Sequence, residues 1–166
     1  MDVIKCKFNQ GFTLMEILVT LLVLSIGLLG LAGMQVFSLT SNYDAYLRTQ
    51  ATFFAYELID KLNANRSEAL SGSYDTTLSS IAGSVTNCQS NTATCSPNQL
   101  AVFEVTQWKC ALGSYQGNAV CNAPLDMTPI LPNGDGTVTR SGGQLTVSVQ
   151  WQGRGNTETV SIVTEL

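Results

Sequence analysis

The first half of the chain carries a long apolar segment. Residues 17–37 hold no formal charge, and at a rise of about 1.5 Å per residue a helix of this length crosses a bilayer core. Its polar residues Thr20 and Ser25 can donate hydrogen bonds to helix carbonyls. Because the segment is apolar on every face, it is typical of a membrane span rather than of a small soluble core. A cleaved secretory signal is the alternative, but the segment is long for one and no Ala-x-Ala site follows.

Beyond this segment, apolar residues continue along only one face of the predicted helix. Apolar residues recur at intervals of three, four and seven, which is typical of an amphipathic helix, and no proline interrupts the region. We predict one helix from about Phe12 to about Arg66, with residues 12–37 in the membrane and residues 38–66 packed against a partner. The one-sided positions are Val36, Leu39, Tyr43, Leu47, Phe54, Leu58 and Leu62.

A second helix and a sheet are predicted in residues 67–166. Ser96, Pro97 and Gln99 form a capping box with proline in the first turn, which predicts a helix from Pro97 to Ala111. Trp108 in this helix is interpreted as a packing residue.

Strict alternation predicts a β-hairpin, with a turn at 152–156 and a second strand over 157–163. A shorter third strand is predicted around Val138. A sheet laid on the amphipathic helix buries both apolar faces, so the predicted fold class is α+β with a long helix against an antiparallel sheet. The buried face of the first strand is Leu145, Val147, Val149 and Trp151.

Composition narrows the possible functions. Only 12% of the residues are charged, the net charge is −4, and the chain has no histidine. The lack of histidine removes Ser-His-Asp triads, Cys-His pairs and histidine-containing metal sites. The charge balance leaves no basic field for nucleic-acid phosphates. We predict neither an enzyme nor a nucleic-acid-binding protein, and no cofactor.

The charges that flank the apolar segment predict its orientation. Lys5 and Lys7 precede it, and Asp44 is the first charged residue after it. The positive-inside bias then keeps the N-terminus in the cytoplasm and exports residues 44–166 to the periplasm.

Five cysteines are present, and Cys6 lies before the apolar segment. Cys88, Cys95, Cys110 and Cys121 are an even number in an exported body, which predicts disulfides with three possible connectivities, local pairing among them. A zinc site is the alternative, but no Cys-x-x-Cys knuckle is present. Residues 132–136 resemble a calcium loop only superficially, and a tight turn is the simpler interpretation.

Glu16 is the one charge between Phe12 and Tyr43. A carboxylate in a membrane helix is costly unless it lies near the interface or finds a partner. Cutting the chain between Gly11 and Phe12 creates an α-amino group one helical turn from Glu16. That amine can pair with Glu16 of its own helix or of a neighbouring subunit, and the pairing is stronger in lipid than in water.

Residues 11–35, GFTLMEILVTLLVLSIGLLGLAGMQ, resemble the class III leader and N-terminal helix of type IV pilins and pseudopilins. The resemblance implies a leader at residues 1–11, cleavage by a prepilin peptidase between Gly11 and Phe12, and N-methylation of Phe12. It also implies that Glu16 pairs with the N-terminus of a neighbouring subunit during assembly.

Residues 95–101 running into Gln107-Trp108, and residues 146–155, resemble PilV-type minor pilins of the pilus modification family. The resemblance implies a minor pilin that helps to initiate the pilus tip complex and so supports twitching motility and cell adhesion. The implied partners are other minor pilins, the major pilin, the prepilin peptidase and the inner-membrane assembly platform. The implied location is the inner membrane and then the extracellular fimbrium. A minor pseudopilin of a type II secretion system, or a bitopic membrane-anchored periplasmic binding protein, is the alternative.

Overall fold

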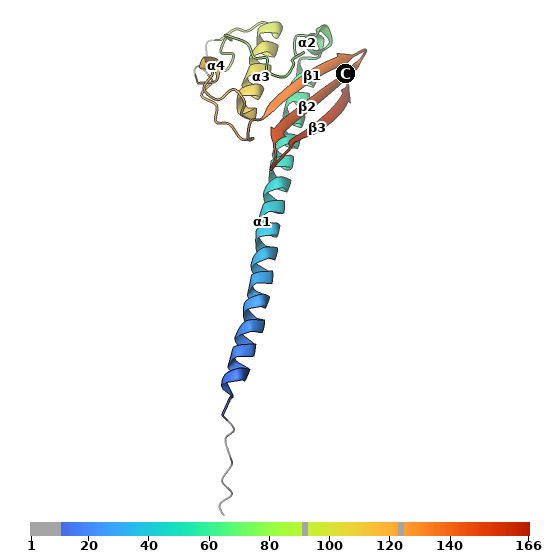
Figure 1. Cartoon of the computed structure of the whole chain (residues 1–166). Helices are drawn as coiled ribbons and strands as arrows, with labels where there is room; N and C mark the ends of the chain where they lie inside the picture. The colour runs from blue at the N-terminus through green and yellow to red at the C-terminus, as the bar shows by residue number, and fades with distance from the viewer. Residues whose placement is uncertain (1–10, 91–92, 123–124) are drawn as a thin grey trace, which may run out of the picture. The chain divides into compact units, whose positions relative to one another are not determined.

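The computed structural model describes residues 11–90, 93–122 and 125–166. It divides the chain into two compact units, Met1–Tyr43 and Asp44–Leu166. The predictions for the basic residues and the cysteine before Gly11 fall outside the described residues. The elements (Figure 1) are α1 (Leu14–Ala64), α2 (Arg66–Ser71), α3 (Pro97–Leu112), α4 (Ala119–Asn122), β1 (Asp135–Ser141), β2 (Gln144–Gln152) and β3 (Thr157–Glu165).

Helix α1 is one uninterrupted helix of 51 residues, close to the predicted one but slightly shorter at both ends. It begins at Leu14 instead of Phe12, because the Thr13 hydroxyl accepts a hydrogen bond from the Glu16 N–H at 3.3 Å and so caps the first turn. The back-bonds predicted for the membrane segment are present, since the hydroxyls of Thr20 and Ser25 each donate to a carbonyl three residues earlier, at 2.8 Å.

At its other end α1 stops at Ala64 instead of Arg66, and the chain turns at Asn65 into the short helix α2. The Asn65 side-chain amide donates to the Pro97 carbonyl at 2.9 Å and to the Tyr74 hydroxyl at 3.3 Å. These contacts with distant parts of the chain hold Asn65 outside helical geometry.

Helix α3 starts as the sequence predicts. The Ser96 hydroxyl accepts from the Gln99 N–H at 3.2 Å, and the Gln99 side chain accepts from the Ser96 N–H at 2.9 Å. Both halves of the capping box are therefore present, and the predicted helix is confirmed with one more residue, Leu112.

Three strands form an antiparallel sheet in the order β1-β2-β3. All three were predicted, and β1 is the shortest, with seven residues against nine in each of the others. The β1–β2 turn contains Gly142 at a φ of +62°, a left-handed conformation that glycine adopts without strain. The β2–β3 turn is closed by a hydrogen bond from the Gly153 N–H to the Asn156 carbonyl, at 2.9 Å.

The core lies between the Asp44–Ala64 part of α1, helix α3 and one face of the sheet (Figure 1). The sequence predicts apolar residues along one face of the long helix, and those of them that lie in the second unit are buried. The rest of the stripe, Val36, Leu39 and Tyr43, is exposed. The predicted inner face of β2 is buried as a whole. The buried residues of the two faces are Leu47, Phe54, Leu58, Leu62, Leu145, Val147, Val149 and Trp151.

Trp108 lies at the centre of this core and is 1% exposed, which confirms the prediction of a packing residue. Its indole N–H donates to the Phe54 carbonyl on α1 at 2.9 Å, so α3 is tied to α1 through one buried hydrogen bond. Strand β1 passes close to the indole at Gly136, and a residue with a side chain at this position would not leave room for Trp108.

The Gly136→Ala variant should be destabilised by about 3 kcal/mol through overpacking. The added Cβ would overlap Trp108 Cη2 and lie 2.7 Å and 2.9 Å from two other indole carbons. Gly143→Ala is the matched control, because a Cβ there meets nothing within 4 Å, and it should change stability by less than about 0.5 kcal/mol. Urea unfolding of the full chain in non-ionic detergent compares them, and equal midpoints would contradict the packing argument.

Two disulfides join neighbouring cysteines, Cys88–Cys95 and Cys110–Cys121, with Cα–Cα distances of 5.8 Å and 5.3 Å. Of the three connectivities that the sequence leaves open, the structure has the local one. Cys110 and Cys121 are buried in a small second cluster with Val120, so this bridge fixes α4 to the end of α3. The tight turn predicted at 132–136 is present but shorter: the Gly134 N–H donates to the Leu131 carbonyl at 3.3 Å, Asn133 has a φ of +47°, and Asp135 already begins β1.

Candidate functional site

The N-terminal unit presents an exposed apolar helix. Among the residues that the structure describes, α1 is the one helix long and apolar enough to cross a membrane, and its most apolar stretch is 0% buried. Phe12, Leu29 and Phe37 are each at least 74% exposed. Burying apolar surface contributes about 25 cal/mol per Å², so a surface of this extent requires lipid or other helices around it.

Glu16 lies in the first turn of this helix, three residues after the capping Thr13. A carboxylate in this position interacts favourably with the partial positive charge of the helix N-terminus. None of the ion pairs in residues 11–90, 93–122 and 125–166 includes Glu16. The side chain is exposed among apolar neighbours such as Met15 and Ile17. Among the described residues, Glu16 is therefore an acid in an apolar surface without an ion-pair partner.

Three glycines of α1, Gly27, Gly30 and Gly33, face open space, since a Cβ on any of them meets nothing within 4 Å. Each costs about 1 kcal/mol of helix propensity relative to alanine. No contact within the described chain accounts for that cost. Small residues on a helix surface allow a neighbouring backbone to approach closely, which is how helices pack in membranes.

A buried ion pair lies in the second unit, and no local pattern of the sequence predicts it. Lys109 on α3 is 0% exposed, and its ammonium lies 3.2 Å from an Asp135 carboxylate oxygen on β1. It also donates to the carbonyls of Thr77 and Ser80 at 2.5 Å each. Burial lowers the pKa of Lys109, and the nearby charge of Asp135 opposes that shift. Lys109 thus connects α3, β1 and the loop that contains residues 77–80.

The Lys109→Met variant should lose about 3–5 kcal/mol of unfolding free energy, because it leaves the Asp135 carboxylate buried without its cation. Lys61→Met is the matched control, since Lys61 forms a partly exposed pair with Glu57 at 2.7 Å, and it should lose less than about 1 kcal/mol. Urea unfolding of the full chain in detergent measures both. A loss no larger than that of the control would contradict a structural role for the buried pair.

Tyr74 is a second buried polar residue, and its hydroxyl donates to a Glu104 carboxylate oxygen at 2.5 Å. Burial, and then the hydrogen bond to Glu104, raise the pKa of Tyr74 above its usual value. A raised pKa in the folded state means that the contribution of Tyr74 to stability is complete below the unfolded pKa of about 10 and is lost as the pH rises above it.

Compared with Tyr74→Phe, the wild-type chain should therefore lose stability above pH 10, by at most about 1.4 kcal/mol per pH unit. Tyr56→Phe, which changes an exposed tyrosine of α1, controls for the loss of a hydroxyl group. Urea unfolding between pH 7 and pH 11 gives the comparison. If the difference in unfolding free energy between wild type and Tyr74→Phe stays constant over this pH range, the pKa of Tyr74 is not raised by folding.

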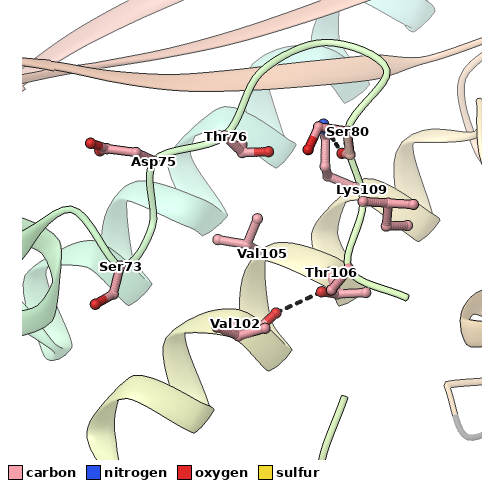
Figure 2. A pocket seen from close by; sticks show the side chains of 10 residues that line it. Ser73, Asp75, Thr76, Ser80, Val102, Val105, Thr106 and Lys109 are labelled. Carbon is pink, nitrogen blue, oxygen red and sulfur yellow. Dashed lines mark hydrogen bonds between the residues drawn. The ribbon is translucent and has the colours of Figure 1, made fainter. Parts of the chain in front are cut away.

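A cavity of about 150 Å³ lies between α3 and residues 73–82 (Figure 2). Two of its polar side chains bond to the protein, since Lys109 turns toward the Ser80 carbonyl and the Thr106 hydroxyl donates to the Val102 carbonyl at 2.6 Å. Its other labelled lining residues are Ser73, Asp75, Thr76 and Val105.

Two sequence families match this chain. Residues 6–32 match the prokaryotic N-terminal methylation motif, and residues 33–106 match the Tt1218-like family, described as type IV pilin Tt1218. These matches support membership in the type IV pilin superfamily. Neither the comparison with curated proteins nor that with solved structures found a match.

The architecture agrees with this assignment, since a long N-terminal helix packed on an antiparallel sheet is consistent with the type IV pilin fold. The type IV pilin family is structural rather than enzymatic. The methylation motif contains Gly11, Phe12 and Glu16 and leads directly into the exposed apolar helix, which indicates anchoring in a membrane.

Proposed function

We propose that this chain is a minor pilin of a type IV pilus. In this proposal a prepilin peptidase cuts between Gly11 and Phe12, the new N-terminus is methylated, and the chain then joins other pilins in the complex that initiates the fibre. The chain would thereby support twitching motility and adhesion. It waits in the inner membrane with residues 1–11 in the cytoplasm and the Asp44–Leu166 unit in the periplasm.

The single observation that carries the proposal is the exposed apolar half of α1, with Glu16 in its first turn and in no ion pair with any residue that the structure describes. A helix used only as an anchor needs no acid at that place. An acid there has a purpose if a cation appears beside it, and cleavage after Gly11 supplies an α-amine four residues away. Pairing with the amine of a neighbouring subunit would also fix the axial register of the two helices.

A minor role is supported by the resemblance of residues 95–101 and 146–155 to PilV-type pilins. The position of the second disulfide agrees with it, since Cys110–Cys121 precedes all three strands instead of enclosing the last ones.

The experiment is affinity purification of the tagged full chain from envelopes, followed by identification of the pilin-like chains that accompany it. Recovery of pilus minor pilins and of the major pilin, with the tagged chain present in sheared fibres, supports the proposal. Recovery of secretion pseudopilins would assign the chain to a type II secretion system instead. Recovery without any pilin-like chain would favour a membrane-anchored binding protein.

A further inference from the structure

The bond that the proposed peptidase cuts lies just outside α1. Residues 11–13 are not helical, and α1 begins with the residue after them. The Thr13 carbonyl accepts the first helical hydrogen bonds, from the Glu16 N–H at 3.1 Å and from the Ile17 N–H at 3.3 Å. Among the hydrogen bonds that join described residues, none uses the Gly11 carbonyl. The carbonyl of the bond to be cut therefore lies outside the helical hydrogen-bond pattern.

A single side chain sets this start of the helix. The Thr13 hydroxyl accepts a hydrogen bond from the Glu16 N–H at 3.3 Å, so this N–H is shared between the hydroxyl and the carbonyl of Thr13. Threonine is one of the residue types that cap helix N-termini. The residues on either side of it, Phe12 and Leu14, have no side-chain acceptor. The cap at this point consequently depends on the Thr13 hydroxyl alone.

The surroundings of the helix start favour growth of α1 if that cap is lost. Phe12, Leu14 and Met15 are each at least 70% exposed, in the part of the chain that indicates anchoring in a membrane. A backbone N–H without a partner costs more beside lipid than in water. An uncapped helix start therefore gains stability when the helix extends toward the N-terminus and its N–H groups find carbonyls there.

Such growth would occupy the reacting group. In an α-helix each N–H donates to the carbonyl four residues earlier, so one more turn would bind the Met15 N–H to the Gly11 carbonyl. Hydrolysis needs that carbonyl free. Water adds to its carbon, the bond to the Phe12 nitrogen breaks, and the two hydrogens of the water end on the new carboxyl group and the new amine. A peptidase cannot attack this carbonyl while the helix holds it.

We infer that Thr13 is a positioning residue for the cleavage. Its hydroxyl holds the start of α1 at Leu14 and so keeps the Gly11 carbonyl outside the helix, where the peptidase can bind it. Thr13 acts through the conformation of the backbone and does not touch the reacting atoms. The inference rests on the proposed cleavage between Gly11 and Phe12.

Thr13→Val tests the inference, because valine has the shape of threonine without the hydroxyl. Thr13→Ser is the matched control, which keeps the hydroxyl and loses the methyl group. Mass spectrometry follows cleavage of each full chain in non-ionic detergent by solubilised envelopes that contain the prepilin peptidase. Thr13→Val should lower kcat/KM about fivefold, the equivalent of about 1 kcal/mol for a typical N-cap. The change should appear in KM, since only the uncapped chains with a free carbonyl bind productively.

Thr13→Ser should be cleaved like the wild-type chain. Equal rates for Thr13→Val and wild type, or a Thr13→Ser variant as slow as Thr13→Val, would overturn the inference. The proposed function fails in a different way, with a wild-type chain that is not cut or a Gly11→Val variant that is cut as fast as wild type.

Amide hydrogen exchange of the uncut chains in detergent is the second measurement. Exchange at the Met15 N–H should be slower in Thr13→Val than in wild type, because this group gains the Gly11 carbonyl as its partner. Thr13→Ser should leave the exchange rate unchanged. If Thr13→Val slows cleavage without slowing exchange at Met15, Thr13 contacts the peptidase directly and its role as a positioning residue is wrong.

Discussion

Replacing Glu16 with alanine should leave processing of the chain intact and lower its incorporation into fibres at least about tenfold. The helix itself loses little with the carboxylate, because Thr13 caps the first turn with its own hydroxyl and the interaction of Glu16 with the helix N-terminus contributes only about 0.3–1 kcal/mol. The α-amine of Phe12, however, would lose its partner in an apolar environment. An unpaired charge costs about 2.5–3.5 kcal/mol at the bilayer centre on insertion scales and less toward the interface, and about 1.4 kcal/mol already corresponds to a factor of ten.

Immunoblots of sheared fibres and of membranes measure the incorporated fraction. Glu57→Ala is the matched control, since it removes an exposed acid from the same helix but in the second unit, and it should incorporate normally. Glu16→Gln, which keeps the volume and loses the charge, should behave like Glu16→Ala. If Glu16→Ala enters fibres as well as Glu57→Ala does, the pairing of Glu16 with an N-terminal amine is wrong.

The Gly11→Val variant should remain uncut, so that its mass equals that of the full chain. A Cβ at Gly11 meets nothing within 4 Å, and the substitution therefore leaves the fold of this chain unchanged. Its effect must arise in the peptidase, whose active site has to enclose the backbone on both sides of the bond that is cut. A branched side chain directly before that bond prevents a close approach.

The control for Gly11→Val is Gly30→Ala, which also adds a Cβ in open space, but within the apolar helix. This variant should be processed normally, because residue 30 lies far along the chain from the bond between Gly11 and Phe12. Mass spectrometry of the purified chains distinguishes the forms. A shortened Gly11→Val chain in normal amounts would place the cut elsewhere or remove the need for it.

Most of the fold follows from local patterns in the sequence. The 3.6-residue period gave α1, the Ser96 capping box gave α3, and the alternation around Val147 gave the hairpin, because each signal depends on residues close together in the chain. The start of α1 was predictable as well, since Thr13 and Glu16 have the spacing of a capping box.

The remaining features depend on contacts between distant residues. Lys109 looks like an ordinary surface lysine of a helix, and only the approach of β1 and of the 77–80 loop makes it a buried ion. The end of α1 is set by the contact of Asn65 with Pro97, 32 residues later. The disulfide pairing likewise depends on how the loops fold, because four cysteines allow three connectivities.

The candidate site shows the same division. The sequence singles out Gly11, Phe12 and Glu16, and the structure places the last in the first turn of an exposed apolar helix. The partner of Glu16 is not among the described residues, because in our proposal it forms only after cleavage. The Tyr74 hydroxyl and the Lys109 ammonium of the second unit bond within that unit.

The most direct test of the account is the mass of the N-terminal peptide of the chain purified from cell envelopes. We expect the mature chain to start at Phe12 and to carry one methyl group on its α-amine. A chain that starts only at Met1, with no shortened form in envelopes or fibres, would contradict the account.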